Sequence, residues 1–123
     1  EYKAQISLEN ILLIRNSTTE KDLILIDPSL SYFRKETKRG VLIDYSLIPY
    51  SSKNYEIYKT YKTLFNGKNI TELTSDEIMN IIYSSNVTDL LLPKGSISEE
   101  YFINKYDNVD LKEFGYLILD VKN

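Results

Sequence analysis

Two aspartates stand where a small α/β protein would hold a ligand. Asp27 follows the apolar run 23–26, and Asp44 follows the apolar run 41–43. If these runs form neighbouring parallel strands, both carboxylates lie at the carboxyl edge of the sheet, where ligands of such folds bind. There they could share a divalent cation and shift each other's pKa. The candidate ligand-binding residues at this rim are Asp27, Ser29, Arg34, Asp44, Tyr45 and Tyr50.

A structural role for both aspartates is the more common alternative. An Asp that precedes Pro, as Asp27 precedes Pro28, often caps the following turn with its carboxylate. An Asp that ends a strand, as we expect of Asp44, often accepts hydrogen bonds from loop N–H groups. We therefore favour structural roles for the pair, and the sequence assigns neither a catalytic residue nor a metal ligand.

The residue types that the chain lacks narrow its chemistry further. It contains no Cys and no His, which removes thiol nucleophiles, thiolate metal sites and the commonest general base. The segment 27–31 that follows the first strand contains no Gly, so a dinucleotide-binding phosphate loop is not expected, and we predict no cofactor. Carboxylates, Lys, Tyr, Ser and Thr remain, which leaves a carboxylate or Mg²⁺ site open.

The charge balance argues against a nucleic-acid partner. With 15 basic and 18 acidic residues, the chain carries a net charge of -3, whereas nucleic-acid binders usually present a basic face. One short basic run contains Arg34, Lys35, Lys38 and Arg39. A charge run of this length predicts a solvated helix face.

Tyrosine is unusually frequent, with 11 copies, and aromatic faces can stack on sugars. Tyr55, Tyr58 and Tyr61 fall on about one face of a predicted helix. Tyrosines at this spacing more often pack against a core, so packing is the favoured interpretation. A sugar platform would instead need several coplanar rings open to water.

Short apolar runs without alternation predict a parallel sheet that helices cover on both faces. We expect strands at 23–27, 41–45 and from 88, then a hairpin of 108–111 with 115–121 whose last strand lies at the sheet edge. A helix is expected at 6–15, with one apolar stripe that includes Ile6, Leu8, Ile11, Leu12 and Ile14. A second is expected at 31–36, capped by Ser29. Further helices are expected at 54–65, 75–86 and 98–102.

These elements predict one α/β domain over residues 1–123. Its expected architecture has three layers, α/β/α, around a mostly parallel sheet of four to five strands with an antiparallel C-terminal edge hairpin. No run approaches the roughly 20 apolar residues of a membrane helix. The chain begins at Glu1 without Met, as a domain excised from a larger protein would.

Several stretches, in their order and spacing, resemble a soluble domain at the C-terminal end of multi-pass prokaryotic membrane proteins. Many of these proteins are similar to GT-C superfamily glycosyltransferases. The stretches that carry the resemblance are Ile14-Arg15-Asn16-Ser17-Thr18, Leu25-Ile26-Asp27-Pro28-Ser29, Phe33-Arg34, Lys38-Arg39-Gly40-Val41-Leu42-Ile43-Asp44-Tyr45, Pro49-Tyr50, Glu56-Ile57-Tyr58, Asp89-Leu90-Leu91-Leu92-Pro93, Tyr106, Gly115 and Tyr116-Leu117-Ile118-Leu119.

The resemblance implies an extracytoplasmic domain, tethered to the membrane by helices that lie outside these residues. It also implies a non-catalytic accessory or recognition role, with cell-envelope glycan or the membrane part of the parent protein as partner, since sugar transfer would belong to that membrane part. The alternative is a small free-standing enzyme or ligand-binding domain, with a carboxylate or Mg²⁺ site at Asp27 and Asp44 beside Arg34. A third hypothesis, a protein-interaction domain, would require a large exposed apolar patch.

Overall fold

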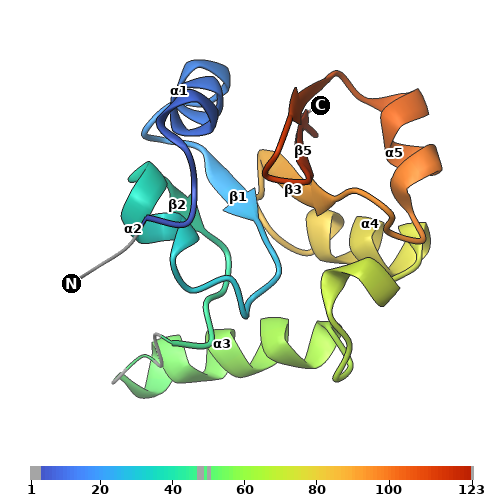
Figure 1. Ribbon diagram of the computed structural model, residues 1–123. Coiled ribbons are helices and arrows are strands. Elements are labelled where there is room, and N and C mark those ends of the chain that lie inside the picture. The colour runs from blue at the N-terminus through green and yellow to red at the C-terminus, as the bar shows by residue number, and fades with distance from the viewer. Residues whose placement is uncertain (1–3, 47–48, 50, 123) are drawn as a thin grey trace.

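A computed structural model describes residues 4–46, 49 and 51–122 of the chain. In these residues, five α-helices and a five-stranded sheet form an α/β fold, as predicted (Figure 1). The strands are β1 (Leu23–Leu25), β2 (Gly40–Val41), β3 (Asp89–Pro93), β4 (Asn108–Leu111) and β5 (Tyr116–Asp120). The helices are α1 (Leu8–Ser17), α2 (Phe33–Thr37), α3 (Ser52–Leu64), α4 (Ser75–Tyr83) and α5 (Glu99–Lys105), with a short 3₁₀ helix, η1 (Ile70–Glu72), before α4.

The sheet is mixed, with strand order β2-β1-β3-β5-β4. β1 pairs in parallel with β2 and with β3, whereas β5 pairs antiparallel with both β3 and β4. The chain runs outward from β1 to β2 and then crosses back through α3 and α4 to β3. The strand order therefore reverses between β1 and β3, which is where open α/β sheets form a crevice for ligands.

The C-terminal hairpin lies at the sheet edge as predicted, but its two strands exchange places relative to the prediction. β5 lies inside the sheet, and β4 forms the edge. The reason is burial on both faces of β5, where Leu117, Ile118 and Leu119 are all buried. β4 exposes Asn108 and Asp110, and polar residues of this kind suit an edge strand.

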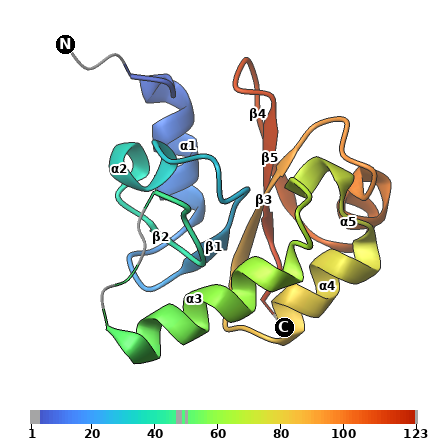
Figure 2. The same cartoon turned by 90° about the horizontal axis from the view of Figure 1, so that it is seen from below.

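Helices cover both faces of the sheet, and the strands bury side chains on both. In β3, Leu90 and Leu92 belong to the hydrophobic cluster beside α4 and α5, while Leu91 belongs to the cluster beneath α1 and α2. Figure 2 shows these helix pairs on opposite sides of the sheet. Unbroken apolar runs thus indicated burial on both faces correctly.

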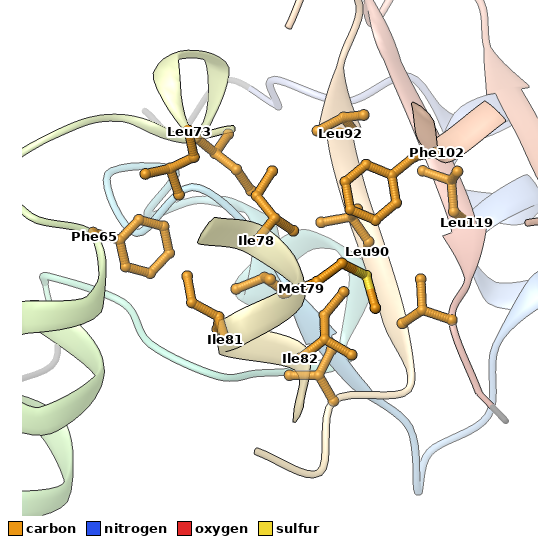
Figure 3. Close-up of a cluster of buried hydrophobic side chains, with 14 of the residues drawn as sticks. Phe65, Leu73, Ile78, Met79, Ile81, Ile82, Leu90, Leu92, Phe102 and Leu119 are labelled. Carbon is orange, nitrogen blue, oxygen red and sulfur yellow. The ribbon is translucent and has the colours of Figure 1, made fainter. Parts of the chain in front are cut away.

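Helix α4 supplies the largest share of one core. Thr74 and Glu77 form a capping box, in which each side chain accepts a hydrogen bond from the other residue's N–H, at 3.2 and 2.9 Å. The helix that begins there places Ile78, Ile81 and Ile82 in a buried cluster with Phe65 and Leu90 (Figure 3). The prediction of this helix is confirmed, although the helix ends at Tyr83 rather than at residue 86.

Two predicted strands are longer than the observed ones. β1 ends at Leu25 instead of residue 27, and β2 contains only Gly40 and Val41. Ile26 and Ile43 are nevertheless buried. The apolar character of a residue indicates that it is buried, not that its backbone pairs with a neighbouring strand. The sequence pattern therefore cannot show at which residue the strand pairing ends.

Near the N-terminus, two local predictions are wrong. Ile14 of the predicted apolar stripe is buried as expected, but Leu8 and Leu12 are 71% and 50% exposed, because α1 turns Asn10 inward beside Ile14. The Asn10 amide donates to the Lys112 carbonyl at 2.8 Å and orients that face toward the β4–β5 turn. Ser29 caps no helix, since α2 begins at Phe33 and the Ser29 hydroxyl donates to Asp27.

Candidate functional site

The carboxyl edge of β1 and β2 lies beside α3 and carries two hollows. The first, called here the α3–β2 hollow, has a volume of about 280 Å³; its wall includes Arg34, Asp44, Asn54, Tyr58 and Tyr61. The second, called the β1 hollow, has a volume of about 550 Å³; its wall includes Asp27, Ser29, Tyr45, Tyr58 and Lys62. Tyr58 separates the two, since it lines both.

Asp27 is held by hydrogen bonds on both of its carboxylate oxygens. Its Oδ1 accepts from the Ile70 N–H at 2.8 Å, and its Oδ2 accepts from the Ser29 N–H at 3.3 Å and from the Ser29 hydroxyl. The first bond joins the end of β1 to the first residue of η1, 43 residues along the chain. These bonds match the structural role that the sequence favoured for Asp27.

Asp44 is buried as well, but only one of its oxygens is satisfied. Its Oδ1 accepts from the Ser46 N–H at 2.9 Å and from the Ser46 hydroxyl at 2.6 Å. Its Oδ2 is buried and has no hydrogen-bond partner among the residues that the structure describes. Such an acceptor is costly unless a donor reaches it. Asp44 is also one of the residues that line the α3–β2 hollow.

Arg34 lies on α2 and lines the same hollow as Asp44. Its side chain is exposed, and in the described part of the chain no ion pair joins it to Asp44. This hollow therefore presents a cationic donor and a carboxylate acceptor that do not neutralise each other by direct contact. A polar ligand could bind between them.

Tyr45 belongs to the β1 hollow rather than to the hollow that Asp44 lines. The Lys62 ammonium lies 5.5 Å from the centre of its ring, a cation–π contact. Partial burial, and then the negative charge of Asp27, raise the pKa of Tyr45 above its ordinary value. Tyr50 falls outside the described residues.

The structure thus separates the six predicted rim residues into two groups. Arg34 and Asp44 share one hollow, and Asp27, Ser29 and Tyr45 share the other. A cation shared by the two aspartates would need both in one cleft, and they line different ones. Among residues 4–46, 49 and 51–122, no group of three or more Asp, Glu, His or Cys could hold a metal ion.

Four wall residues of the α3–β2 hollow that the sequence did not assign to a site come from α3: Asn54, Ile57, Tyr58 and Tyr61. The two tyrosines were expected to pack, and both are half-buried. The helix as described contains no fully buried residue, because most of its side chains are polar. This polar composition could have indicated from the sequence that α3 lies at the rim. A helix too polar to enter the core can still pack tyrosines there, because their rings are apolar and their hydroxyls can face water.

The tyrosines of α3 do not form a sugar platform of three open rings. Tyr55 and Tyr58 stack on each other, with ring centres 6.2 Å apart and planes inclined by 20°. The Tyr61 hydroxyl donates to the Ser84 carbonyl at 3.4 Å, toward the end of α4. Their packing favours a role as walls of the two hollows.

Comparison of the chain with protein-family models, curated proteins and solved structures found no match. The resemblance to a domain of multi-pass membrane proteins therefore stays a prediction. In the described part of the chain, no helix has the length and apolar character needed to cross a membrane.

Proposed function

We propose that this chain is a non-catalytic recognition domain that binds a neutral, hydroxyl-rich ligand, such as one sugar unit of a glycan, in the α3–β2 hollow. The observation that carries the proposal is the buried Oδ2 of Asp44, which has no partner among the described residues. Leaving such a group unsatisfied costs about 1–3 kcal/mol, and a ligand hydroxyl that donates to it would recover much of that free energy.

The wall of the hollow selects the ligand class. Asp44 offers an acceptor, while Arg34 and Asn54 offer donors, and hydroxyl groups can satisfy both kinds because each donates and accepts. A cationic ligand is disfavoured by Arg34, and an anionic one by Asp44. A neutral ligand with several hydroxyls fits this pair of opposite charges best.

The shape and the apolar parts of the wall support the same class. Tyr58, Tyr61 and Ile57 contribute apolar surface against which the face of a sugar ring can pack. The volume of about 280 Å³ lies at the small end of ligand pockets, which favours one sugar unit over a long chain.

Binding without reaction is favoured by the chemistry of the same wall. Glycoside hydrolysis uses a pair of carboxyl groups on either side of the bond that breaks. Asp44 is the sole carboxylate among the described residues that line this hollow. The resemblance supplies the setting that we propose: an extracytoplasmic domain of a multi-pass membrane protein, similar to a lipid-linked-sugar glycosyltransferase, that recognises cell-envelope glycan.

The test is a titration of the ¹⁵N-labelled chain with a panel of neutral hexoses and N-acetylhexosamines, followed by amide chemical shifts. We expect one class of sugar to give saturable shifts at Asp44, Asn54 and Tyr58. Asp44→Asn should abolish them, because the carboxylate acceptor is lost. Asp107→Asn, an equal charge change at an exposed position, should leave them intact.

Absence of saturable shifts for every sugar in the panel would contradict the proposal. So would equal binding by the Asp44→Asn and Asp107→Asn variants.

A further inference from the structure

The α3–β2 hollow lies against a free edge of the sheet. The strand order places β2 at one end, and the hollow runs along residues 41–44, the end of β2 and its continuation. The Leu42 N–H donates to the Ile24 carbonyl at 3.1 Å, toward the interior of the sheet. Because the backbone groups of successive strand residues point to opposite sides, the N–H and C=O of Val41 point away from β1. In the described chain neither group has a hydrogen-bond partner, as is usual at the edge of a sheet.

The opposite wall of this hollow is one side of α3. Asn54, Ile57, Tyr58 and Tyr61 recur at spacings of three and four residues, so they lie on one face of the helix. The side-chain amide of Asn54 carries two N–H donors and a carbonyl acceptor. The hollow therefore has backbone amide groups on one wall, and a side-chain amide with apolar neighbours on the other.

Of the basic run, the described structure brings one member to this hollow. Arg34 lines it, whereas Arg39 is 6% exposed, which corrects the expectation that the whole run forms a solvated face. The Nε of Arg39 donates to the Thr18 hydroxyl at 2.8 Å, and its Nη2 donates to the carbonyls of Arg15 and Thr18, each at 3.2 Å. One cation and the carboxylate of Asp44 thus line the hollow, so its wall does not select a charged substituent on the ligand.

We propose that the sugar unit carries an acetamido group, which bridges the edge of β2 and α3. The inference rests on the proposed function and specifies its ligand as an N-acetylhexosamine. A secondary amide is planar and trans, so its C=O and its N–H point in opposite directions. The acetamido C=O accepts from the Val41 N–H, as an added strand would, and the acetamido N–H donates to the side-chain carbonyl of Asn54. Val41 is half-buried whereas the next outward residue, Ile43, is buried, so the ligand reaches the Val41 N–H more readily.

The rest of such a sugar matches the remaining wall. Its hydroxyls reach Asp44, whose Oδ2 has no partner among the described residues. Its acetyl methyl group packs against Ile57, an apolar side chain that is 46% exposed without the ligand. A hexose that lacks the acetamido group leaves the Val41 N–H unpaired. A peptide strand of the usual length, about five to six residues, would extend beyond a hollow of about 280 Å³.

The first test compares the affinities of N-acetylglucosamine and N-acetylgalactosamine with those of glucose and galactose, from the amide shifts of the ¹⁵N-labelled chain. We expect at least one N-acetylhexosamine to bind about tenfold more tightly than its parent hexose, because it gains two hydrogen bonds. Shifts of the Val41 backbone amide and the Asn54 side-chain amide should accompany this binding. Equal affinities within both sugar pairs would overturn the inference and leave the proposed function standing. Absence of binding by all four sugars would overturn both.

A backbone variant examines the edge itself. Val41→Pro removes the outward N–H, and proline is accepted in edge strands at such positions. The affinity for the N-acetylhexosamine should fall by about three- to tenfold, while the affinity for the hexose should not change. Asn108→Pro is the matched control on the opposite edge: the Asp120 N–H donates to the Asp107 carbonyl at 3.1 Å, so the Asn108 N–H points outward from β4. Equal affinities of the two variants for the N-acetylhexosamine would overturn the inference.

A thermal melt shows whether Val41→Pro is folded. If it is not, Asn54→Ala takes its place, since Asn54 is exposed on the first turn of α3 and its loss leaves the core intact. This variant removes the acceptor of the acetamido N–H. It should reduce the preference for the N-acetylhexosamine over the hexose by about three- to tenfold, and an unchanged preference would overturn the inference.

A peptide ligand is tested with N-acetylalanine N-methylamide, which offers amide groups without sugar hydroxyls. It should bind at least about tenfold more weakly than the N-acetylhexosamine, because it supplies no hydroxyl donor to Asp44. Tighter binding of this amide than of the sugar would overturn the inference in favour of an added peptide strand.

Discussion

Asp27 and Asp44 occupy similar places in the sequence but differ in how the fold uses them. Each follows an apolar run, each is buried, and each receives an N–H and a hydroxyl from the serine two residues later. Asp27 gains a third donor from Ile70, so both of its oxygens are satisfied. Asp44 gains none among the described residues. The difference teaches that one local turn can serve as a structural tie or as a binding group, depending on what packs beside it.

The positions of β1 and β2 in the sheet explain this difference. β1 lies between β2 and β3 in the sheet. The short helix η1, which precedes α4, lies close to the end of β1, so the N–H of Ile70 can donate to Asp27. β2 is a two-residue edge strand, and α3, which has no fully buried residue as described, lines the hollow beside it. A hollow remains there instead of a donor.

The largest effect is expected from Asp27→Ala. It would leave the Ile70 N–H buried without an acceptor and would release both donors of Ser29. We expect the free energy of unfolding to fall by about 2–4 kcal/mol, measured by urea denaturation. Asp107→Ala, at an exposed position, should stay within about 0.5 kcal/mol of the parent chain. A comparable small loss for both variants would remove the distinction between the two aspartates.

A change of opposite sign is expected at the other aspartate. Asp44→Asn removes a buried, half-satisfied charge and keeps an oxygen that can accept from Ser46. The free energy of unfolding should rise by about 1 kcal/mol in the same urea experiment. A loss as large as that of Asp27→Ala would mean that Asp44 is a structural tie after all.

The smallest effect concerns two tyrosines near Asp27. Burial, and then the charge of Asp27, raise the pKa of Tyr45 and of Tyr116 above the ordinary value of 10.0. A raised folded-state pKa gives stability that is complete below the ordinary pKa and is lost as pH rises through the folded value. We therefore expect stability to decline above about pH 10.

The pKa values of the same two tyrosines also provide a test that distinguishes Asp27 from Asp44. Asp27→Asn should lower the pKa of Tyr45 and Tyr116, and Asp44→Asn should lower neither, as followed by ¹³C NMR of the ring carbons that carry the hydroxyls. An equal response to both substitutions would contradict the separate hollows.

The fold was more predictable than the site. Unbroken apolar runs revealed β1, β3 and the inner strand of the hairpin, because burial on both faces leaves no room for polar residues. Five of the six predicted rim residues line hollows near the carboxyl ends of β1 and β2, since strand ends gather at one sheet edge. Their division into two hollows was not predictable, because it depends on Tyr58, which α3 brings to the boundary between them.

The sequence by itself determined the α/β class, the presence of α4, the C-terminal hairpin and the burial of β3 on both faces. These features rest on neighbouring residues and short periodicities. The tertiary structure alone decided which polar groups meet: Ile70 with Asp27 across 43 residues, and Arg39 with Thr18 across 21. Partners that distant leave no periodic signal, because loop packing selects them. The tertiary structure also decided that Asp44 Oδ2 and Arg39 Nη1 are buried without a hydrogen-bond partner among the described residues. The sequence cannot show this, because it does not reveal which groups pack beside them.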